Sequence, residues 1–283
     1  MNIQWYPGHM LETKRLLKNS ISKVDAILEV LDARLPIASE NPILTQLCKD
    51  KIRIKVLNKS DLADPVITDY WLSYFEHQRN VPAISICASQ QTQVEKALHS
   101  CISRITRNRA RKVKVIVVGI PNTGKSTILN TLVGKKVAKT GNVPAITRQQ
   151  QRTSLKNNID LYDTPGILWP VIEPKERALA LAASGAISDT ALDYHEIGIF
   201  VAGLLLKKYP HLLLERYAFL KKIPQDESEL IEKIGTARGC LVKGGNINYK
   251  KAAEILIRDL RSGKIGKISF ETPKDIESEN EII

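Results

Sequence analysis

The sequence predicts an α/β protein in which a mostly parallel sheet covered by helices is followed by a smaller, all-helical domain. Short runs rich in Val, Ile and Leu alternate with segments of helical period up to about residue 163. Such near-continuous apolar strands are typical of parallel sheets buried on both faces. After about residue 170 helical period continues without a strand pattern. At 283 residues, the chain is long enough for two domains.

Five apolar runs are predicted to form the strands: residues 25–32, 52–58, 82–86, 113–119 and 158–163. Segments of helical period lie between them, for example at 67–81 and 92–107. This alternation is typical of parallel strands joined by crossover helices. We expect the first domain to span residues 1–172.

A helical domain is expected over residues 173–283, with apolar-periodic stretches at 175–187 and 195–208. Its best-defined helix follows Asn248, which can cap a helix start, and ends at Gly263, which can adopt a left-handed turn. One side of this helix is apolar: Tyr249, Ala252, Ala253, Leu256, Ile257 and Leu260. The other side is cationic: Lys250, Lys251, Arg258 and Arg261. We expect the apolar side to pack and the cationic side to face outward.

The composition is that of an ordinary globular protein, with 43% apolar and 25% charged residues. The longest nearly unbroken apolar run, residues 197–206, is about half a membrane span. The N-terminus has no basic cluster followed by an apolar run, so no export signal is expected. The four cysteines are scattered without a CxxC pair, which argues against a disulfide framework or a zinc site. We expect a cytoplasmic protein.

The net charge of +12 is concentrated in two segments. Residues 104–114 carry six basic side chains and no acidic one, and residues 234–268 carry eight basic and two acidic ones. These segments account for the whole excess. A charge run is often only a solvated surface, and the first segment could also be a linker. Taken together, the two segments favour a polyanionic partner.

A phosphate-binding loop, GIPNTGKST, is predicted at residues 119–127, directly after a predicted strand. Its glycines allow backbone N–H groups to close round phosphates. Lys125 can reach the outer phosphates, and the hydroxyl of Ser126 can bind Mg²⁺. Because the loop has the required strand before it, a chance Gly-rich turn is a poor alternative.

A second phosphate-sensing motif, DTPG, begins at Asp163 at the end of a predicted strand. Asp163 would hold Mg²⁺ through water, and the N–H of Gly166 would sense the γ-phosphate. Between the two motifs, Thr147 is expected to cover the metal in the triphosphate state, although an exposed loop threonine often has no such role. The polar segment 139–150 is expected to change order with the γ-phosphate.

The motif NKSD at residues 58–61 is predicted to recognise guanine. The carboxylate of Asp61 would accept hydrogen bonds from the ring N–H and the exocyclic amine, a donor pair that adenine lacks. Asn58 would tie the base pocket to the phosphate loop, and the stem of Lys59 would lie over the purine face. Ala88, after the next strand, would offer its backbone N–H to the guanine carbonyl.

The base-reading motif precedes the phosphate loop, which is the reverse of the usual order in GTP-binding proteins. Circular permutation explains this order, because joining the original ends and cutting the chain elsewhere preserves every contact. The sequence therefore predicts a circularly permuted P-loop GTPase domain, and the basic segment 104–114 would join the original ends. The residues expected to bind GTP are Asn58, Lys59, Asp61, Ala88, Asn122, Thr123, Gly124, Lys125, Ser126, Thr127, Thr147 and Gly166. Those expected to hold magnesium are Ser126, Thr147 and Asp163.

The chain resembles the YlqF/RbgA family of circularly permuted GTPases that act in ribosome assembly. The matching segments are IQWYPGHM at 3–10, VLDARLP at 30–36, NPIL at 41–44, LNKSDLAD at 57–64, GIPNTGKST, AKTGNVPAIT at 138–147, DTPGILWP at 163–170 and RGCLVKGGNINY at 238–249. The resemblance implies GTP hydrolysis coupled to late maturation of the large ribosomal subunit. It implies a C-terminal helical domain that touches rRNA. The expected partners are the large ribosomal subunit, its rRNA and its ribosomal proteins, and we expect a monomer. The residues expected to touch RNA are Arg238, Lys243, Lys250, Lys251, Arg258 and Arg261.

Catalysis is expected to involve His9, Lys125 and Gly166. Many GTPases orient the attacking water with a glutamine after the DxxG glycine, but here that residue is Ile167, so slow intrinsic turnover is expected. The resemblance assigns this role to His9, although the YPGHM segment could instead be a structural turn or an RNA-facing loop. Asn122 resembles the asparagine that binds K⁺ in potassium-stimulated GTPases, and could alternatively stabilise the turn.

Two other functions remain compatible with the sequence. The chain could be a nucleotide-gated RNA-binding module in which hydrolysis is incidental. It could also be a membrane-surface GTPase whose basic helix 249–262 binds anionic lipid, although this helix has no Trp or Phe to anchor it. We favour the assembly GTPase and expect no membrane partner.

Overall fold

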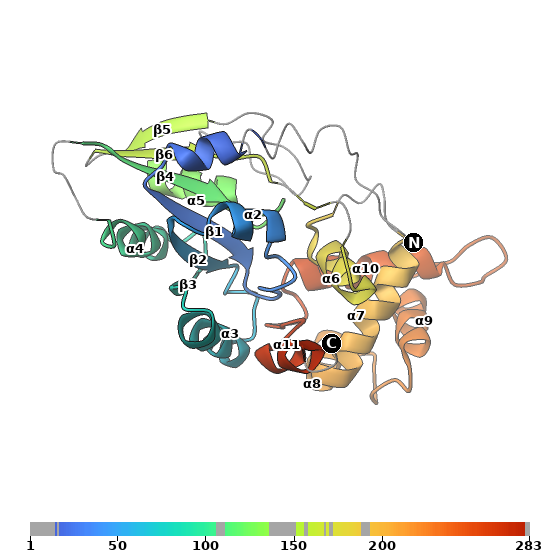
Figure 1. Cartoon of the computed structure of the whole chain (residues 1–283). Coiled ribbons are helices and arrows are strands. Elements are labelled where there is room, and N and C mark those ends of the chain that lie inside the picture. The colour runs from blue at the N-terminus through green and yellow to red at the C-terminus, as the bar shows by residue number, and fades with distance from the viewer. Residues whose placement is uncertain are drawn as a thin grey trace. The chain divides into compact units, whose positions relative to one another are not determined.

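The computed structural model describes residues 15, 17–105, 111–135, 151–155, 158–166, 168–169, 172–187 and 193–280. The chain divides into two compact units (Figure 1). The first contains residues 1–172 together with 271–283, and the second contains residues 173–270.

The first unit is built on a six-stranded sheet with the strand order β3-β2-β1-β4-β6-β5. The strands are β1 (Ala26–Asp32), β2 (Ile52–Asn58), β3 (Ala83–Ile86), β4 (Val113–Val118), β5 (Gln151–Leu155) and β6 (Ile159–Asp163). All neighbouring strands pair in parallel except β5, which pairs antiparallel with β6. The predicted mostly parallel α/β sheet is confirmed. The sequence did not predict β5, because QRTSL is polar and lies at the sheet edge.

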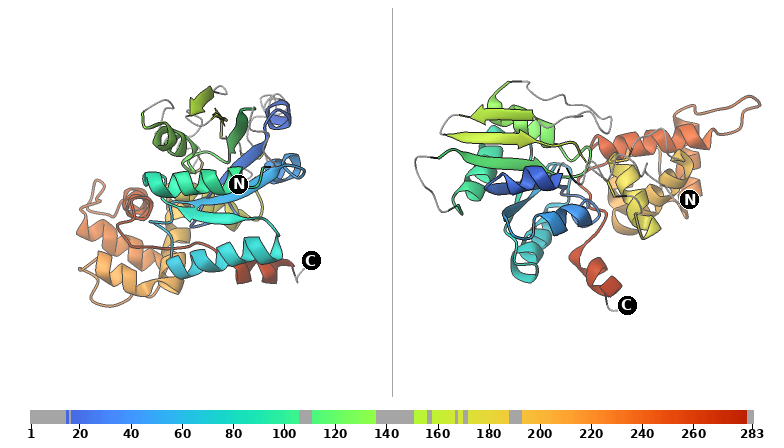
Figure 2. Two further views of the ribbon diagram at one scale, coloured as in Figure 1. Left: turned by 90° about the vertical axis from the view of Figure 1, so that its left-hand side faces the viewer. Right: turned by 45° about the horizontal axis from the view of Figure 1, so that its top comes forward.

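Helices cover both faces of the sheet (Figure 2). On one face, α4 (Gln91–Ile102) and α5 (Lys125–Val133) pack against side chains of the central strands. On the other face, a helical segment at 17–22 and α2 (Pro42–Leu47) pack against β1 and β4. Burial on both faces explains why the strand sequences are almost continuously apolar rather than alternating.

An aromatic cluster lies beneath the ends of β1 and β2. It is formed by α3 (Pro65–Ser73) and the π-helical turn η1 (Tyr74–Gln78), where Trp71 and Phe75 are fully buried. Trp71 stacks on Phe75 with ring centroids 5.9 Å apart. Large buried aromatic rings contribute strongly to a core, so this cluster supports the strand ends that lead into the base-reading motif.

The C-terminal residues belong to the sheet unit, which corrects the expectation that the helical domain runs to the end of the chain. The carboxylate of Glu271 accepts hydrogen bonds from the backbone N–H groups of Ile37, at 2.5 Å, and Ala38, at 3.1 Å. The Nε1–H of Trp71 donates to the carbonyl of Glu271 at 3.2 Å. These contacts place the segment leading into α11 (Pro273–Asn280) on the first unit.

The second unit is helical. Its described helices are α6 (Lys175–Ser184), α7 (Tyr194–Lys208), α8 (Pro210–Arg216), α9 (Glu227–Ala237) and α10 (Tyr249–Arg261). The capping oxygen of Asn248 accepts a hydrogen bond from the N–H of Lys251 at 3.0 Å, as its sequence position predicts. Gly263 follows α10 with φ of 73°, the left-handed conformation expected there.

The apolar face of α10 packs as expected with one exception. Ala252, Ala253, Leu256, Ile257 and Leu260 are buried. Tyr249 is 41% exposed, since it lies in the first turn of the helix. Its ring meets that of His195 edge to face, with centroids 6.1 Å apart. Asp259 of the same helix is also buried, and it forms an ion pair with Arg216 at 2.8 Å.

Among the described residues, no single helix is long and apolar enough to cross a membrane. The consecutive helices α7 and α8 reach the required length and hydropathy only as a pair, and the two are bent by 110° at their junction.

Candidate nucleotide-binding site

The motifs predicted from the sequence meet at one edge of the sheet. β2 ends at Asn58, β4 runs into the phosphate loop, and β6 ends at Asp163. The three strands belong to one parallel set, so their carboxyl ends lie at the same edge. A base-reading motif that precedes the phosphate loop in the chain is therefore brought to it by the fold.

Asn58 joins the base-reading motif to the phosphate loop directly. Its Nδ2–H donates to the carbonyl of Thr123 at 2.7 Å, and only 2% of the residue is exposed. Gly124 adjoins this contact with φ of 97°, and a Cβ atom there would lie 2.1 Å from Nδ2 of Asn58. A glycine is therefore required at this position both for its backbone conformation and for the close approach.

The role expected for Ala88 is corrected by its hydrogen bonds. Its backbone N–H donates to Oδ1 of Asn58 at 2.9 Å, and its carbonyl accepts from Oγ1 of Thr131 at 2.7 Å. The amide is buried, and its N–H is occupied by Asn58. Ala88 therefore holds Asn58 in place, and we do not retain it as a contact to the guanine carbonyl.

Lys59 and Asp61 differ in their surroundings. Lys59 has φ of 63°, and its Nζ donates to Oδ2 of Asp32 at 2.8 Å. Burial lowers the pKa of Lys59, although the carboxylate of Asp32 opposes this shift. Asp61 is exposed to solvent, where its carboxylate is accessible to a base.

Asp32 and Arg34 were not assigned a role from the sequence. Nε and Nη2 of Arg34 donate to the two carboxylate oxygens of Asp32 at 3.0 and 2.9 Å. Burial alone would raise the pKa of Asp32, but Arg34 and Lys59 outweigh it and hold the pKa well below its usual range. The available signal was the acidic residue that ends the predicted strand, in VLDARLP.

The phosphate loop is held in shape by its own side chains. The Oγ1–H of Thr123 and the Nζ of Lys125 both donate to the carbonyl of Ile120, at 3.0 and 2.7 Å. Burial lowers the pKa of Lys125 to about 8, although the charge of Asp163 opposes this shift and the charge of Lys59 adds to it. Asn122 has φ of 58° in this loop, while Ser126 and Thr127 are half-buried at the start of α5.

The DTPG motif lies against the phosphate loop. Oγ1 of Thr164 donates to the carbonyl of Val117 on β4 at 2.8 Å, which fixes the start of the motif. A Cβ atom at Gly166 would lie 2.6 Å from the N atom of Pro121 and 2.9 Å from Nζ of Lys125. Only glycine allows this approach, so Gly166 is placed beside the lysine predicted to bind the outer phosphates.

The donors present fit a magnesium ion bound together with phosphates. The hydroxyl of Ser126 and the buried carboxylate of Asp163 are hard oxygen ligands of the kind that Mg²⁺ prefers. Across the described ranges there is no cluster of three or more His, Cys, Asp or Glu that could hold a metal without phosphates. Thr147, the third expected ligand, lies outside the described residues, as do His9 and Ile167.

Nucleotide affinity is expected to fall at alkaline pH. The Lys125 ammonium, with a pKa of about 8, loses its proton as the pH rises, whereas bound phosphates would raise this pKa. The nucleotide-bound form therefore holds more protons above pH 8, and GDP should bind about tenfold more weakly at pH 9 than at pH 7. Titration with a fluorescent GDP analogue measures this change. A Lys125→Met variant with the same pH dependence as the wild type would contradict the assignment.

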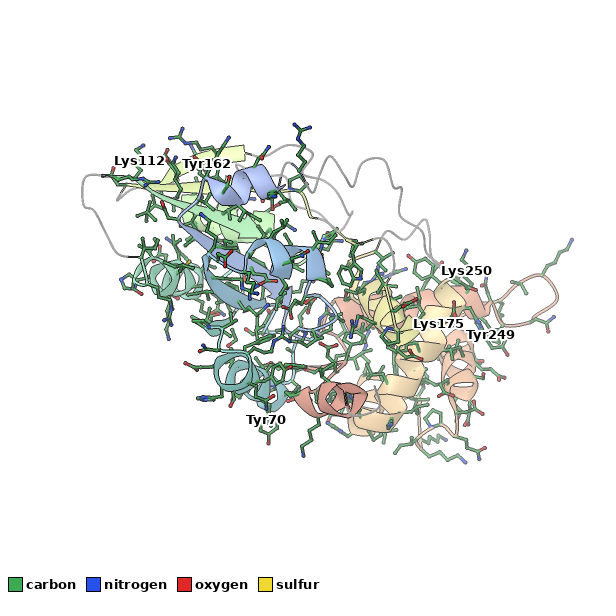
Figure 3. All side chains as sticks on the ribbon, viewed as in Figure 1. Tyr70, Lys112, Tyr162, Lys175, Tyr249 and Lys250 are labelled. Atoms are coloured by element: carbon green, nitrogen blue, oxygen red, sulfur yellow. The ribbon has the colours of Figure 1, made fainter. Side chains whose placement is uncertain are left out.

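The basic residues predicted to contact RNA lie in the second unit, and not all of them are free to do so. Arg238, Lys243, Lys250, Lys251 and Arg258 are exposed. Tyr249 and Lys250 are the first two residues of α10 (Figure 3). Arg261 is a correction: its Nε and Nη2 donate to the carbonyls of Ala183 and Ala182 at 3.0 and 2.8 Å, which caps the end of α6. We do not retain Arg261 as an RNA contact.

Comparison with known proteins gives consistent matches. The model of a family described as 50S ribosome-binding GTPase matches residues 114–201. Ribosome biogenesis GTPase A of Bacillus cereus is 40% identical over 97% of this chain and 95% of its own length. GNP-bound YlqF from T. maritima is 28% identical, with a TM-score of 0.68 over 93% of this chain and 99% of that chain. A GDP-bound YlqF structure is 29% identical, with a TM-score of 0.67 over 92% of this chain and 100% of that chain.

Proposed function

Because this chain belongs to the ribosome biogenesis GTPase A family, and is a GTPase that acts in ribosome biogenesis, we propose that it couples GTP hydrolysis to a late step in assembly of the large ribosomal subunit. The observation that carries the nucleotide part is the 2.7 Å hydrogen bond from Asn58 to Thr123, which joins the base-reading and phosphate-binding motifs. The large-subunit part is supported by the description of the matching family as 50S ribosome-binding.

The residues at the carboxyl ends of the parallel strands would each have a different role in binding GTP. Asp61 would accept the two guanine donors, and Lys125 would bind the outer phosphates. The N–H of Gly166, beside Lys125, would donate to the γ-phosphate. Ser126 and Asp163 would hold Mg²⁺, which when bound neutralises negative charge on the phosphates.

Positioning of the attacking water is proposed for His9. Ile167 follows the DTPG glycine and cannot form a hydrogen bond to water through its side chain. An imidazole that titrates near neutral pH can orient or deprotonate water. In this proposal hydrolysis is slow on the isolated chain and faster on the ribosomal particle.

Potassium is proposed to bind at Asn122 beside the phosphates. The residue lies in the phosphate loop with φ of 58°, a conformation that asparagine tolerates better than most residues. A monovalent cation there would supply the positive charge that an arginine supplies in other GTPases. We expect hydrolysis to be about tenfold or more faster in K⁺ than in Na⁺, and this difference to vanish in Asn122→Ala. Equal rates of phosphate release in K⁺ and Na⁺ for the wild type would contradict the proposal.

Contact with rRNA is proposed for the exposed basic residues of the second unit. Lys250 and Lys251 occupy the first turn of α10, which has no acidic residue. Cations there are opposed by the helix dipole, whereas an anion bound at the same place is favoured. RNA phosphates would relieve this unfavourable arrangement. Because the chain runs from the DTPG motif directly into this unit, we propose that affinity for RNA follows the nucleotide state.

The proposal is tested by binding to purified large-subunit precursors. Lys250→Ala/Lys251→Ala/Arg258→Ala should weaken binding on the order of tenfold and reduce the dependence of binding on salt by about three units of slope. Lys175→Ala, which removes another exposed lysine of the same unit, is the matched control. Sedimentation at several salt concentrations, with a GTP analogue and with GDP, measures both effects. If the triple variant bound the particle as tightly as the wild type, the proposed interface would be refuted. If the wild type bound equally well with the GTP analogue and with GDP, the proposed coupling to the nucleotide state would be refuted.

A further inference from the structure

A charged cluster joins the end of β1 to the base-reading motif. It consists of Asp32, Arg34 and Lys59, and we call it the Asp32 cluster. Oδ2 of Asp32 accepts from both Nη2 of Arg34 and Nζ of Lys59, at 2.9 and 2.8 Å. The side chains of Asp32 and Arg34 are 4% and 1% exposed, whereas that of Lys59 is 22% exposed. Lys59 is therefore the only member of this cluster that a ligand can reach.

Backbone pairing fixes the position of Asp32 relative to the base-reading motif. Asp32 is the last residue of β1 and lies opposite Asn58 in the pairing with β2. The next residue, Ala33, donates its N–H to the carbonyl of Asn58 at 2.7 Å. On the other side, Oγ of Ser39 accepts from the N–H of Asp32 at 3.1 Å. The backbone position of Asp32 is therefore fixed, so its carboxylate can hold the Lys59 ammonium in one place.

Lys59 needs an acidic partner with a fixed position for two reasons. Its φ of 63° lies in the left-handed region, which costs a lysine about 1–2 kcal/mol and must be maintained by contacts. Its ammonium also repels that of Lys125 in the phosphate loop. An acidic partner lowers this repulsion and holds the end of the flexible lysine side chain, so that the aliphatic stem is free to cover a base.

We propose that Asp32, oriented by Arg34, is a positioning residue that places the Lys59 side chain over the purine and thereby sets the affinity for guanine nucleotides. Arg34 fixes the orientation of the Asp32 carboxylate, because a guanidinium binds a carboxylate through two parallel hydrogen bonds. One oxygen then remains directed at Lys59. This inference rests on the proposed role of the site in binding GTP.

A double-mutant cycle distinguishes positioning through Lys59 from a general contribution to folding. Asp32→Asn and Lys59→Met are each expected to weaken GDP binding about tenfold, the size expected for a lost charged hydrogen bond. If Asp32 acts through Lys59, the double variant Asp32→Asn/Lys59→Met should bind no more than about twofold more weakly than Lys59→Met alone. Losses that multiply to about a hundredfold, or GDP binding by Asp32→Asn equal to wild type, would overturn the proposal.

Glu29→Gln is the matched control. Glu29 is a buried acid on the same strand as Asp32, and its Oε2 accepts from Nζ of Lys55 at 3.0 Å. Neutralising it should lower the melting temperature and leave GDP affinity within about twofold of wild type, because its partner Lys55 is fully buried and is paired with Glu29 and Glu40. Equal loss of GDP affinity in Glu29→Gln and Asp32→Asn would mean that buried charge on β1 supports only folding, and would also overturn the proposal.

A charge-balanced variant covers the case in which Asp32→Asn does not fold, since that change leaves Arg34 buried without its acid. Asp32→Asn/Arg34→Met removes one charge of each sign and should retain the GDP-binding defect. Wild-type GDP affinity in this folded variant would overturn the proposal. Failure of the unmodified chain to bind GDP would instead refute the proposed nucleotide site itself, so the two failures are distinguishable.

Discussion

Asp61→Asn is expected to weaken binding of guanine nucleotides on the order of a thousandfold and to create a preference for xanthine nucleotides. Guanine presents a ring N–H and an exocyclic amine, and a carboxylate can accept both hydrogen bonds. An asparagine offers one acceptor and one donor group. This pair matches xanthine, which has a ring N–H beside a carbonyl oxygen. Because Asp61 is exposed, the substitution should not disturb the fold.

The measurement is competition of GDP, XDP and ADP for a fluorescent nucleotide. Asp64→Asn is the matched control, because Asp64 is an acid of the same loop whose carboxylate caps α3 by accepting from the N–H of Val66 at 3.0 Å. Asparagine caps helices as well as aspartate does, so this control should keep the wild-type preference. An Asp61→Asn variant that still prefers GDP over XDP would mean that another residue reads the base.

His9→Ala is expected to slow GTP hydrolysis on the ribosomal particle by about a hundredfold to ten-thousandfold, which is the usual effect of losing a general base or a water-orienting group. Binding of a non-hydrolysable GTP analogue should remain unchanged, because His9 is proposed to act on the water and not on the nucleotide. The variant should consequently stay bound to the particle. Single-turnover phosphate release and sedimentation of the particle measure the two effects.

His77→Ala is the control for His9→Ala, since His77 is an exposed histidine of η1 outside the nucleotide site. Unchanged hydrolysis in His9→Ala would assign the YPGHM segment a structural or RNA-facing role. Slow hydrolysis with normal release from the particle would favour a nucleotide-gated binding module in which hydrolysis is incidental.

The fold was predictable where local pattern and environment agree. β1 is buried along its whole length, so its apolar run identifies it without knowledge of the rest of the chain. β5 was missed because a polar edge strand is defined by its pairing with β6, which is a non-local contact. The return of Glu271 to the first unit was missed for the same reason, because its partners Ile37 and Trp71 are about two hundred residues away.

The meeting of the phosphate loop and the NKSD motif was predictable, because each has fixed residue types at a fixed spacing, and Asn58 is hydrogen-bonded to Thr123. The errors concern residues whose hydrogen bonds depend on tertiary structure. The N–H of Ala88 is occupied by Asn58, and the guanidinium of Arg261 is occupied by the end of α6. A helical wheel places Arg261 with the outward-facing cations, but it cannot reveal a carbonyl supplied by another helix.

The central claim is that motifs in inverted sequence order form one site specific for guanine nucleotides. Calorimetric titration of the unmodified chain with GDP and with ADP, both with Mg²⁺, tests it most directly. We predict one GDP per chain and at least about a thousandfold weaker binding of ADP, since adenine would leave the carboxylate of Asp61 without its two donors. Equal affinity for GDP and ADP, or two GDP molecules bound per chain, would contradict the claim.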